Sequence, residues 1–204
     1  MVVALGAAAT DRFHIEDFAV FPGETRTVSI LLDNEEEYTA FQCDLYLPEG
    51  LSVDEDSFTL TERKSSSHML TVNEFPGNCY RLMSYSLKVK TYSGNSGALV
   101  TFDVTANNNF GVPRIVQIKN MLFTKPSGEE IAFADESCTV SLKGDVNSDG
   151  LFDINDVTDS IAYVLGNSTV DINVVAANVY EDNLMDINDV TTLIGWLLSG
   201  ISHS

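Results

Sequence analysis

Hydrophobic and polar residues alternate along the chain from about residue 11 to residue 142. The clearest run is Phe-Gln-Cys-Asp-Leu-Tyr-Leu at 41–47, and a period of two is typical of a strand with one buried face. Turn sequences such as Phe-Pro-Gly at 21–23 and Ser-Gly-Asn-Ser-Gly at 93–97 separate the runs. The expected strands are 12–20, 25–33, 41–47, 51–60, 67–74, 79–90, 97–106, 114–124 and 129–142. About nine short strands without a long helix predict a two-sheet β-sandwich.

The hydrophobic period changes after residue 144. Two groups of apolar residues there recur at helical spacing, and they predict two short helices. The groups are Val157, Ile161, Val164 and Leu165, and Val190, Ile194, Leu197 and Leu198. We therefore expect two modules, at 11–142 and 144–200. The junction between them is too short to be a flexible tether, so the two parts are expected to pack against each other.

Charge is distributed unevenly between these two parts. The 204 residues hold 11 Lys and Arg against 30 Asp and Glu, a net charge of −19, but residues 144–204 hold ten acids and no Lys or Arg. A nucleic acid or an anionic membrane is excluded as a partner because both require basic residues. The acidic segment contains too many Leu, Ile and Val for a disordered tail. A bound cation among its carboxylates is the better explanation.

The acidic segment contains an internal repeat at an offset of 33 residues. Asp-Gly-Leu-Phe-Asp-Ile-Asn-Asp-Val at 149–157 matches Asp-Asn-Leu-Met-Asp-Ile-Asn-Asp-Val at 182–190. Six consecutive residues, Asp-Ile-Asn-Asp-Val-Thr, occur in both copies. This pattern indicates a duplicated structural unit.

The first copy fits a twelve-residue calcium loop. Acidic or amide residues occupy its alternate positions, and Gly150 stands at position 6, where the backbone turns sharply. A hard cation such as Ca²⁺ takes six to eight oxygen ligands, which this pattern supplies. The expected ligands are Asp145, Asn147, Asp149, the carbonyl of Leu151, Asp153 and Asp156.

The second copy is a poorer calcium loop. Asn178 replaces the acid at position 1, and Tyr180 replaces the oxygen donor at position 3. Fewer anionic ligands imply weaker binding, so this loop either binds calcium weakly, uses Glu181 or a water as a substitute, or stays empty. Its remaining candidate ligands are Asn178, Asp182, Leu184, Asp186 and Asp189.

Residues 144–200 resemble a type I dockerin. The resemblance rests on Gly-Asp-Val-Asn-Ser-Asp-Gly at 144–150 and on the Asp-Ile-Asn-Asp sequence, which occurs twice, each time before a helix. It implies a small helical module of duplicated EF-hand-like loops that binds a cohesin without catalysis. Dockerin contacts centre on loop positions 10 and 11, which here are Ile154, Asn155, Ile187 and Asn188. Those positions are often Ser or Thr in the family. The alternative for this pair is that Asn caps the helix and Ile fills the core.

Residues 11–142 resemble a cohesin, or the related sandwich of carbohydrate-binding modules. The segments that carry this resemblance are Phe-Pro-Gly-Glu-Thr at 21–25, the run at 40–51 and Gly-Ala-Leu-Val-Thr-Phe-Asp-Val at 97–104. It implies a jelly-roll sandwich. Exposed aromatic residues would favour sugar binding, although packing between strands is the usual role of such residues. The candidates are Tyr38, Tyr46, Tyr80, Tyr85 and Tyr92 in the sandwich. Tyr163 and Trp196, at equivalent places in the repeat, belong either to a docking patch or to a contact with the other module.

The sequence carries no recognisable catalytic motif. The three histidines are far apart, and neither a phosphate loop nor a nucleophile elbow is present. We therefore expect no enzymatic activity. Cys43, Cys79 and Cys138 form no metal-type pair, and buried thiols are more probable for them than a disulfide. The apolar start, Met-Val-Val-Ala-Leu-Gly-Ala-Ala-Ala-Thr, is either the remnant of a secretory signal or a disordered end.

These features together predict a secreted or surface-attached calcium-binding protein that assembles other proteins at a carbohydrate-degrading or adhesive surface. Its expected partner is a cohesin-like or dockerin-like module, which is either part of the same chain or foreign to it. Two alternatives remain open. In the first, the sandwich binds polysaccharide and calcium only stabilises the structure. In the second, the two modules pack together within one chain.

Overall fold

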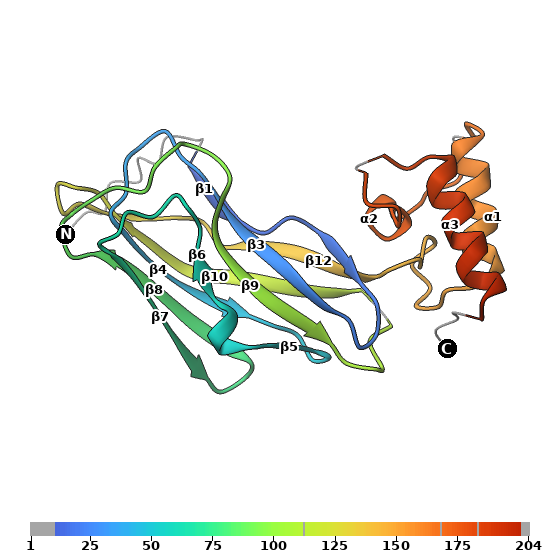
Figure 1. The fold of residues 1–204 in the computed structure, drawn as a ribbon, viewed down its shortest axis with the longest axis horizontal. Helices are drawn as coiled ribbons and strands as arrows, with labels where there is room; N and C mark the ends of the chain where they lie inside the picture. The colour runs from blue at the N-terminus through green and yellow to red at the C-terminus, as the bar shows by residue number, and fades with distance from the viewer. Residues whose placement is uncertain (1–10, 112, 168, 183, 201–204) are drawn as a thin grey trace. The chain divides into compact units, whose positions relative to one another are not determined.

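The computed structural model describes residues 11–111, 113–167, 169–182 and 184–200 of the chain. The expectations for the N-terminal apolar segment at 1–10 lie outside the described residues. Within the described ranges the chain forms strands, a 3-10 turn at Glu55–Ser57 and three α-helices (Figure 1). The strands are β1 (Arg12–His14), β2 (Phe18–Val20), β3 (Thr25–Asp33), β4 (Ala40–Tyr46), β5 (Leu51–Val53), β6 (Thr59–Leu60), β7 (His68–Phe75), β8 (Cys79–Ser86), β9 (Ala98–Ala106), β10 (Arg114–Thr124), β11 (Glu130–Ala132) and β12 (Glu136–Leu142). The helices are α1 (Ile154–Val164), α2 (Val174–Ala177) and α3 (Ile187–Leu198).

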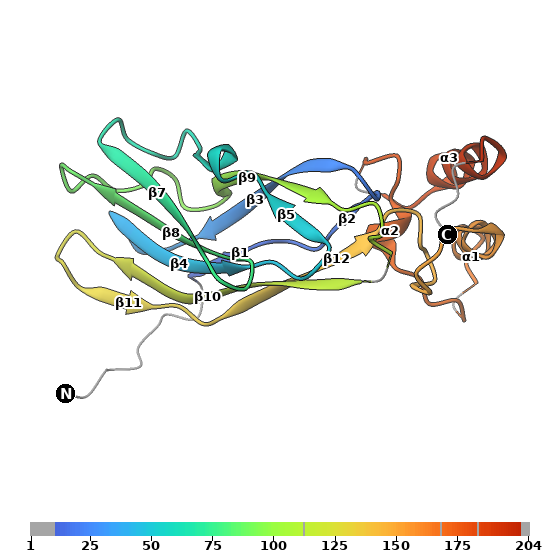
Figure 2. The same cartoon turned by 90° about the horizontal axis from the view of Figure 1, so that it is seen from below.

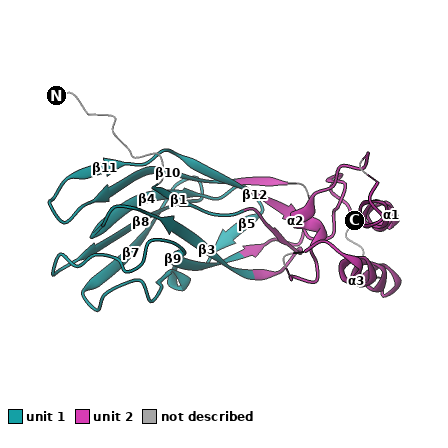
Figure 3. Ribbon diagram, turned by 90° about the horizontal axis from the view of Figure 1, so that it is seen from above, with its two compact units in different colours: residues 1–16, 26–104, 116–138 teal, residues 17–25, 105–115, 139–204 magenta. Residues whose placement is uncertain are grey.

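Contacts within the chain divide it into two compact units (Figure 3). Unit 1 holds residues 1–16, 26–104 and 116–138, and unit 2 holds residues 17–25, 105–115 and 139–204. Unit 1 contains most of the strands. Unit 2 contains β2, the end of β12 and all three helices. The unit that contains the helices therefore includes segments that lie far earlier in the sequence.

The strands form two sheets (Figures 1 and 2). One sheet has the order β1-β3-β9-β5, with β6 beside β9. The other has the order β2-β12-β10-β4-β8-β7, with β11 beside β10. The defined pairs of unit 1 are antiparallel, whereas β2 and β12 pair in parallel within unit 2. The two-sheet sandwich predicted from the alternating pattern is confirmed.

The described residues form twelve strands, more than the nine or so predicted. Three of the predicted runs, 12–20, 51–60 and 129–142, each divide into two strands. Local side-chain bonds explain the break in 51–60, because the Asp54 carboxylate accepts a hydrogen bond from the backbone N of Asp56 at 3.0 Å and starts the 3-10 turn. The alternation of hydrophobic and polar residues shows that a run is extended, but it does not show where a local hydrogen bond interrupts the pairing of strands.

Strand β4 follows the predicted alternation at all but one position. Phe41, Cys43 and Leu45 are fully or almost fully buried, and Gln42 and Tyr46 on the other face are partly exposed, but Asp44 on that face is buried. Strand β4 lies between β10 and β8, in register with Leu45 opposite Tyr80. A central position explains why one face of this strand is so thoroughly covered.

An aromatic cluster joins the two sheets inside unit 1. The ring of Phe13 on β1 lies 5.1 Å from Phe41 on β4 and 5.2 Å from Phe123 on β10. Phe123 also packs against Tyr38 at 5.1 Å and stacks on Phe133 at 4.3 Å. Large rings that touch from both layers fill the space between the sheets and fix their separation.

Unit 2 has a hydrophobic core of its own. Helices α1 and α3 pack on each other, and a cluster of buried apolar residues lies among the loops and helices. They are Val146, Phe152, Val157, Ala177, Val179 and Leu193. The two helices predicted from the period of 3.6 residues are present, and α2 between them was not predicted. Asp153 and Asp186 cap α1 and α3 in the same way, each with a capping box.

Gly144 allows the chain to leave β12 tightly. Its φ is +93°, and a Cβ at this position would lie 3.0 Å from the Phe152 ring. Only glycine combines this backbone conformation with such a close approach. The predicted junction at 142–144 is therefore a packed turn, in which the backbone N of Gly144 donates to the carbonyl of Ala176 at 2.8 Å.

Replacing Phe123 with alanine is expected to destabilise the sandwich by about 3 to 5 kcal/mol, because its ring contacts both sheets and the cavity cannot close fully. Chemical denaturation followed by circular dichroism measures the change. The exposed Leu87 provides a control whose replacement with alanine should change the free energy of unfolding by about 0.5 kcal/mol at most. Equal effects of the two substitutions would contradict this role for the aromatic cluster.

Candidate functional site

Two carboxylates organise the first predicted calcium loop from inside. Asp145 is buried, and it accepts hydrogen bonds from the backbone N of Asp149 and of Gly150, both at 2.9 Å. Asp156 is also buried, and it accepts from the backbone N of Val146 at 2.7 Å and of Asp153 at 2.8 Å. The first and last acids of the loop therefore hold its backbone closed.

These two carboxylates lie in an unfavourable electrostatic environment. The pKa of Asp145 is raised to about 6, chiefly by burial and also by the charges of Asp156 and Asp149, while the hydrogen bonds from two backbone N–H groups oppose the shift. Burial also raises the pKa of Asp156. Like charges buried close together favour proton uptake or a counter-cation. No Lys or Arg follows residue 143 in the sequence.

The donor set of the first loop fits a hard cation in its chemistry. All six expected ligands offer oxygen, and the side-chain oxygens of Asn147 and Asp149 also accept local backbone hydrogen bonds. Asp153 is engaged as the helix cap, with Oδ1 accepting from the backbone N of Asn155 at 2.7 Å. Among the residues that the structure describes, no three Asp, Glu, His or Cys side chains converge as a metal-binding group. Calcium in this loop stays a prediction.

The second loop repeats the scaffold of the first with different side chains. Asp189 is buried and accepts from the backbone N of Tyr180 at 2.8 Å and of Asp186 at 2.9 Å, as Asp156 does in the first loop. Asn178 accepts from the backbone N of Glu181 at 3.1 Å. The side chain of Tyr180 is exposed, so position 3 contributes no buried donor.

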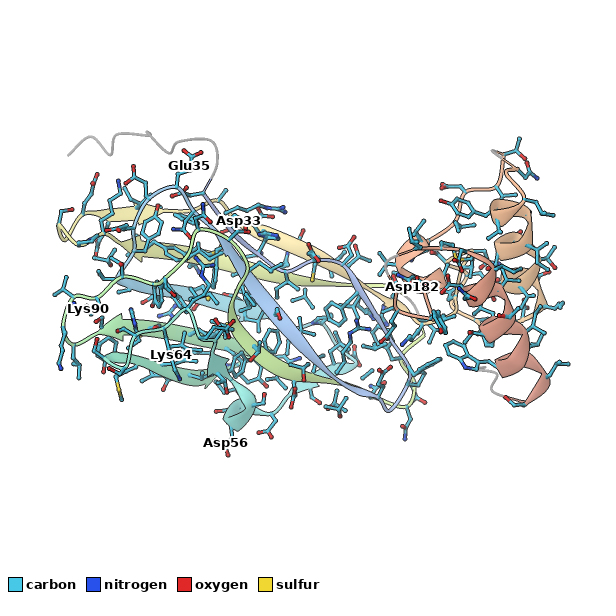
Figure 4. All side chains as sticks on the ribbon, turned by 45° about the horizontal axis from the view of Figure 1, so that its top comes forward. Asp33, Glu35, Asp56, Lys64, Lys90 and Asp182 are labelled. Atoms are coloured by element: carbon cyan, nitrogen blue, oxygen red, sulfur yellow. The ribbon has the colours of Figure 1, made fainter. Side chains whose placement is uncertain are left out.

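Positions 5 and 7 of the second loop lie at the surface. Asp182, labelled in Figure 4 on the loop before α3, is exposed and accepts from the backbone N of Leu184 at 3.1 Å. Asn183 at position 6 lies outside the described residues. Asp186 is engaged as the cap of α3. Asp149 and Leu151, at the same positions of the first loop, are also exposed, so the two loops differ in burial at positions 1 and 3.

The four predicted docking residues are all exposed. Ile154 and Ile187 are 57% and 58% exposed, so the alternative in which they fill the core is wrong. The second half of that alternative is wrong as well, because Asp153 and Asp186, and not the asparagines, cap the two helices. Asn155 and Asn188 each donate to a carboxylate oxygen of the capping aspartate, at 3.3 and 3.4 Å. The duplication therefore presents the same Ile-Asn pair twice, at the start of two helices that pack on each other.

The equivalent aromatic residues of the repeat have different environments. Tyr163 is exposed, whereas Trp196 is partly buried and packs edge-on against Phe21, with ring centroids 4.8 Å apart. Trp196 also lies 6.1 Å from Phe152 in the first loop. The alternative of a packing contact therefore holds for Trp196 within unit 2.

A second candidate surface lies on unit 1, where strands β7 and β8 expose apolar side chains. We call Met69, Phe75, Met83 and Tyr85 the β7–β8 face. Met69 pairs with Tyr85, Met83 lies opposite Thr71, and Phe75 lies opposite Cys79, so their side chains share the outer face of the sheet. An exposed cluster of large apolar residues is a feature of interaction surfaces.

An ion pair between a buried acid and a partly exposed arginine supports this face. Asp44 is buried on β4, and Arg81 on β8 donates to its two oxygens at 2.6 and 2.8 Å. Asn120 donates to the same carboxylate at 2.8 Å from a bulge in β10, where its φ is +52°. The guanidinium of Arg81 in turn lies 5.3 Å from the centre of the Phe75 ring. The carboxylate thus fixes a cation against the exposed aromatic.

A hollow of about 170 Å³ adjoins the β7–β8 face. It is lined by residues of β4, β8 and β10 and by Glu130 on β11. Met83 and Tyr85 belong both to the lining and to the face. The apolar surface is therefore continuous with a depression large enough for one side chain of a partner.

The predicted sugar-stacking tyrosines are mostly core residues. Tyr38, Tyr80 and Tyr92 are buried, so their assignment as candidate exposed aromatics is wrong. Tyr38 donates to Asp11, and Tyr92 donates to Ser84, which explains how their hydroxyls are accommodated. Tyr85 is exposed and Tyr46 partly so.

Sequence reasoning missed Met69, Phe75, Met83 and Arg81. The alternation in β7 and β8 shows that one face points outward, and the apolar residues on that outward face were the available signal. The three cysteines are buried and form no disulfide. No helix among the described residues has the length and apolarity required to cross a membrane.

Comparisons with known proteins identify the fold of the sandwich. No protein-family model matches the sequence, and no curated protein matches it. The sixth cohesin of scaffoldin B from Acetivibrio cellulolyticus, solved in complex with a dockerin, is similar in structure, with a TM-score of 0.55 at 11% identity over 65% of this chain and 99% of that chain.

Two further cohesins give the same result. A non-cellulosomal cohesin from the archaeon Archaeoglobus fulgidus has a TM-score of 0.53 at 12% identity, over 65% of this chain and 91% of that chain. A Clostridium thermocellum cohesin, solved in a type I cohesin–dockerin complex, has a TM-score of 0.51 at 11% identity, over 67% of this chain and 99% of that chain. The sandwich therefore has a cohesin-like fold. The dockerin resemblance of residues 144–200 stays a prediction.

Acid should remove the contribution of Asp44 to stability. The hydrogen bonds from Arg81, opposed by burial, hold the pKa of Asp44 below its ordinary value. Because the folded pKa is the lower one, this stabilisation is fully present above the unfolded pKa of about 3.9 and is lost as the pH falls through the folded pKa. Asp44→Asn should therefore destabilise by about 1 to 3 kcal/mol at pH 6, and the difference should shrink towards zero in strong acid.

Urea denaturation at both pH values measures this effect. Asp56→Asn, at an exposed position in the 3-10 turn, is the control. A deficit of Asp44→Asn that is the same at pH 6 and at low pH would show that the carboxylate charge does not act through the Arg81 pair.

Proposed function

We propose that this chain is a non-catalytic, extracellular assembly protein. Its cohesin-like sandwich docks a dockerin-type helical module on the β7–β8 face, and its own loop–helix segment is a calcium-dependent module of the dockerin type. The observation that carries the proposal is the exposed apolar β7–β8 face on a cohesin-like sandwich. Cohesins of the same fold from Acetivibrio cellulolyticus and Clostridium thermocellum were solved in complexes with dockerins.

The composition of the β7–β8 face favours a protein partner with an acidic surface. Its apolar side chains are accompanied by the bases Arg81 and Lys119, and Lys119 lies 5.6 Å from the ring centre of Tyr46. Apolar anchors together with arginine are characteristic of interface cores. A dockerin-type module with the charge of residues 144–204, ten acids without a base, would complement these cations.

The loop–helix segment is proposed to bind one calcium ion in its first loop. Asp145, Asn147, Asp149, Leu151, Asp153 and Asp156 would hold the ion. The bound ion would neutralise carboxylates that repel one another in the loop. The residues of the chain then connect the loop to the helix, because Asp156 ties the loop backbone to the start of α1 and the capping box orients the helix. Millimolar affinity, common in extracellular modules, suits a secreted or surface-attached protein.

The duplicated helices offer a docking surface for a cohesin-type partner. Ile154 and Ile187 are exposed to the same extent, and Leu165 and Leu198 at the other ends of the helices are also exposed. Each of these apolar residues occurs once in each copy of the repeat. A partner can therefore contact one copy or the other through equivalent residues.

Removing one charge from the first loop tests the role of calcium. Asp149→Asn should lower the melting temperature by about 5 to 10 °C in millimolar calcium, because ligand binding stabilises only the folded state. The same variant should match the wild type in excess chelator. Differential scanning fluorimetry measures both conditions, and an equal loss in both would contradict the metal role.

Altering the centre of the β7–β8 face tests the docking site. Met83→Asp should weaken binding of dockerin-type modules at least about tenfold, because a charge replaces an apolar anchor. The matched control is Thr59→Asp, at an exposed position of β6 in the other sheet. Surface plasmon resonance against a panel of calcium-loaded dockerins, with a glycan array in parallel, measures binding. Glycan binding lost in Met83→Asp, without binding of any dockerin, would support the polysaccharide alternative instead.

A further inference from the structure

Lys143 occupies an unusual position for a lysine. It is only 7% exposed, and it is the last basic residue before the 61 residues that contain no Lys or Arg. A buried ammonium requires an anionic partner or other polar contacts. The residues around Lys143 therefore show which anion it pairs with.

Three contacts fix the Lys143 side chain and backbone within unit 2. The ammonium forms an ion pair with the carboxylate of Glu181. It also lies 5.5 Å from the centre of the Phe21 ring, in a cation–π contact. The backbone N of Lys143 donates to the carbonyl of Val20 at 3.0 Å, next to the end of β2. The lysine therefore connects a strand end with Glu181.

Glu181 lies at position 4 of the second loop. Its φ is +59°, and Ser148 at the equivalent position of the first loop has a φ of +61°. The two loops thus share a left-handed turn at this point. They differ in its side chain, because only the second loop has a carboxylate there and only that carboxylate pairs with Lys143.

The same loop has lost two of the side chains that a metal would need. Position 1 is the uncharged Asn178 and position 3 is the exposed Tyr180, whereas Asp182 at position 5 is exposed just as Asp149 is in the first loop. Calcium requires six to eight oxygen ligands, whereas an ammonium requires only a few acceptors and one counter-charge. The second loop therefore has enough acceptors for an ammonium but too few ligands for calcium.

We propose that the ammonium of Lys143 is the resident cation of the second loop. It stands in for a metal ion, pairs with Glu181 and holds this loop against the end of β2. The chain then binds one calcium ion and not two. This inference deepens the proposed function and rests on it only for the calcium of the first loop.

A second contact connects the first loop to the same segment, Val20–Phe21 at the end of β2. Phe21, whose ring faces Lys143, also packs against Trp196 on α3, and Trp196 lies 6.1 Å from Phe152 at position 8 of the first loop. The segment Val20–Phe21 therefore contacts the second loop through Lys143 and reaches the first loop through Trp196. Both loops are held by one strand end and not by a flexible linker.

Calcium titration of the full chain tests the stoichiometry. Isothermal calorimetry should give one site, Asp149→Asn should abolish it, and the matched second-loop variant Asp182→Asn should leave affinity and stoichiometry unchanged. Two sites, one of them lost in Asp182→Asn, would overturn the inference and leave the proposed function intact. If the wild type binds no calcium, the calcium role in the proposed function fails, and the inference is decided by the experiment that follows.

A double-mutant cycle in excess chelator tests the Lys143–Glu181 pair without any metal. Lys143→Met keeps the aliphatic stem on Phe21, and Glu181→Gln keeps the shape of the acid. Each single variant should lower the melting temperature by about 3 to 6 °C, and the double variant should lower it no further than the worse single one. The single tryptophan, Trp196, reports unfolding of this unit by fluorescence.

The pair of the partly buried Lys125 with the exposed Glu36 is the control, and Lys125→Met should change the melting temperature by about 1 °C at most. Additive effects of Lys143→Met and Glu181→Gln would overturn the inference, as would single effects no larger than that of the control. If Lys143→Met does not fold, the Glu181→Gln variant alone decides, because half of its side chain is exposed and the fold tolerates it. In that case the absence of any shift in Glu181→Gln overturns the inference.

Discussion

Buried carboxylates that need a cation organise both units of this chain. Asp44 in the sandwich is compensated by Arg81, whereas the buried Asp145 and Asp156 of the first loop accept hydrogen bonds from backbone N–H groups, and the neighbouring Lys143 pairs with Glu181. Removing an ionised carboxylate from water is costly unless a cation or several N–H donors replace the lost solvation. The raised pKa values in the first loop and the lowered pKa of Asp44 are two outcomes of this one constraint. The stability of the loop–helix segment therefore depends on what neutralises it.

The duplication shows how a protein can meet the same constraint in different ways. Asp156 and Asp189 are both buried, and both tie the loop backbone to the following helix. The surrounding charges differ, because the first loop retains acids at positions 1 and 5 and the second pairs Glu181 with Lys143. An internal ammonium is always present, whereas a metal ion depends on its concentration outside the protein. Under the proposed function, one repeat would respond to calcium and the other would serve as a fixed anchor.

Local patterns in the sequence predicted the elements but not their long-range partners. The period of two identified the strands of the sandwich, and the repeat identified both loops and both long helices, since these signals come from neighbouring residues. The Lys143–Glu181 and Asp44–Arg81 pairs span 38 and 37 residues and depend on how distant segments meet. Alternation also fails to say whether a tyrosine such as Tyr38 or Tyr92 faces the core, because an aromatic residue with a satisfied hydroxyl is accepted there. Exposure of Ile154 and Ile187 was likewise decided by how the two helices pack.

A fold shared at 11 to 12% identity does not determine the partner of a sandwich. The side chains on the outer face of the sandwich determine the partner. On this chain they combine large apolar groups with an arginine that is held in place by a buried acid. An arginine fixed in this way loses little conformational entropy on binding, so its contact with an acidic partner is not offset by the cost of ordering it. Met69 and Met83 add surfaces that adapt to different partner shapes. If the β7–β8 face docks a partner as proposed, the Asp44–Arg81–Phe75 arrangement would favour the choice of that partner by charge, and the two methionines would tolerate variation in the apolar contacts.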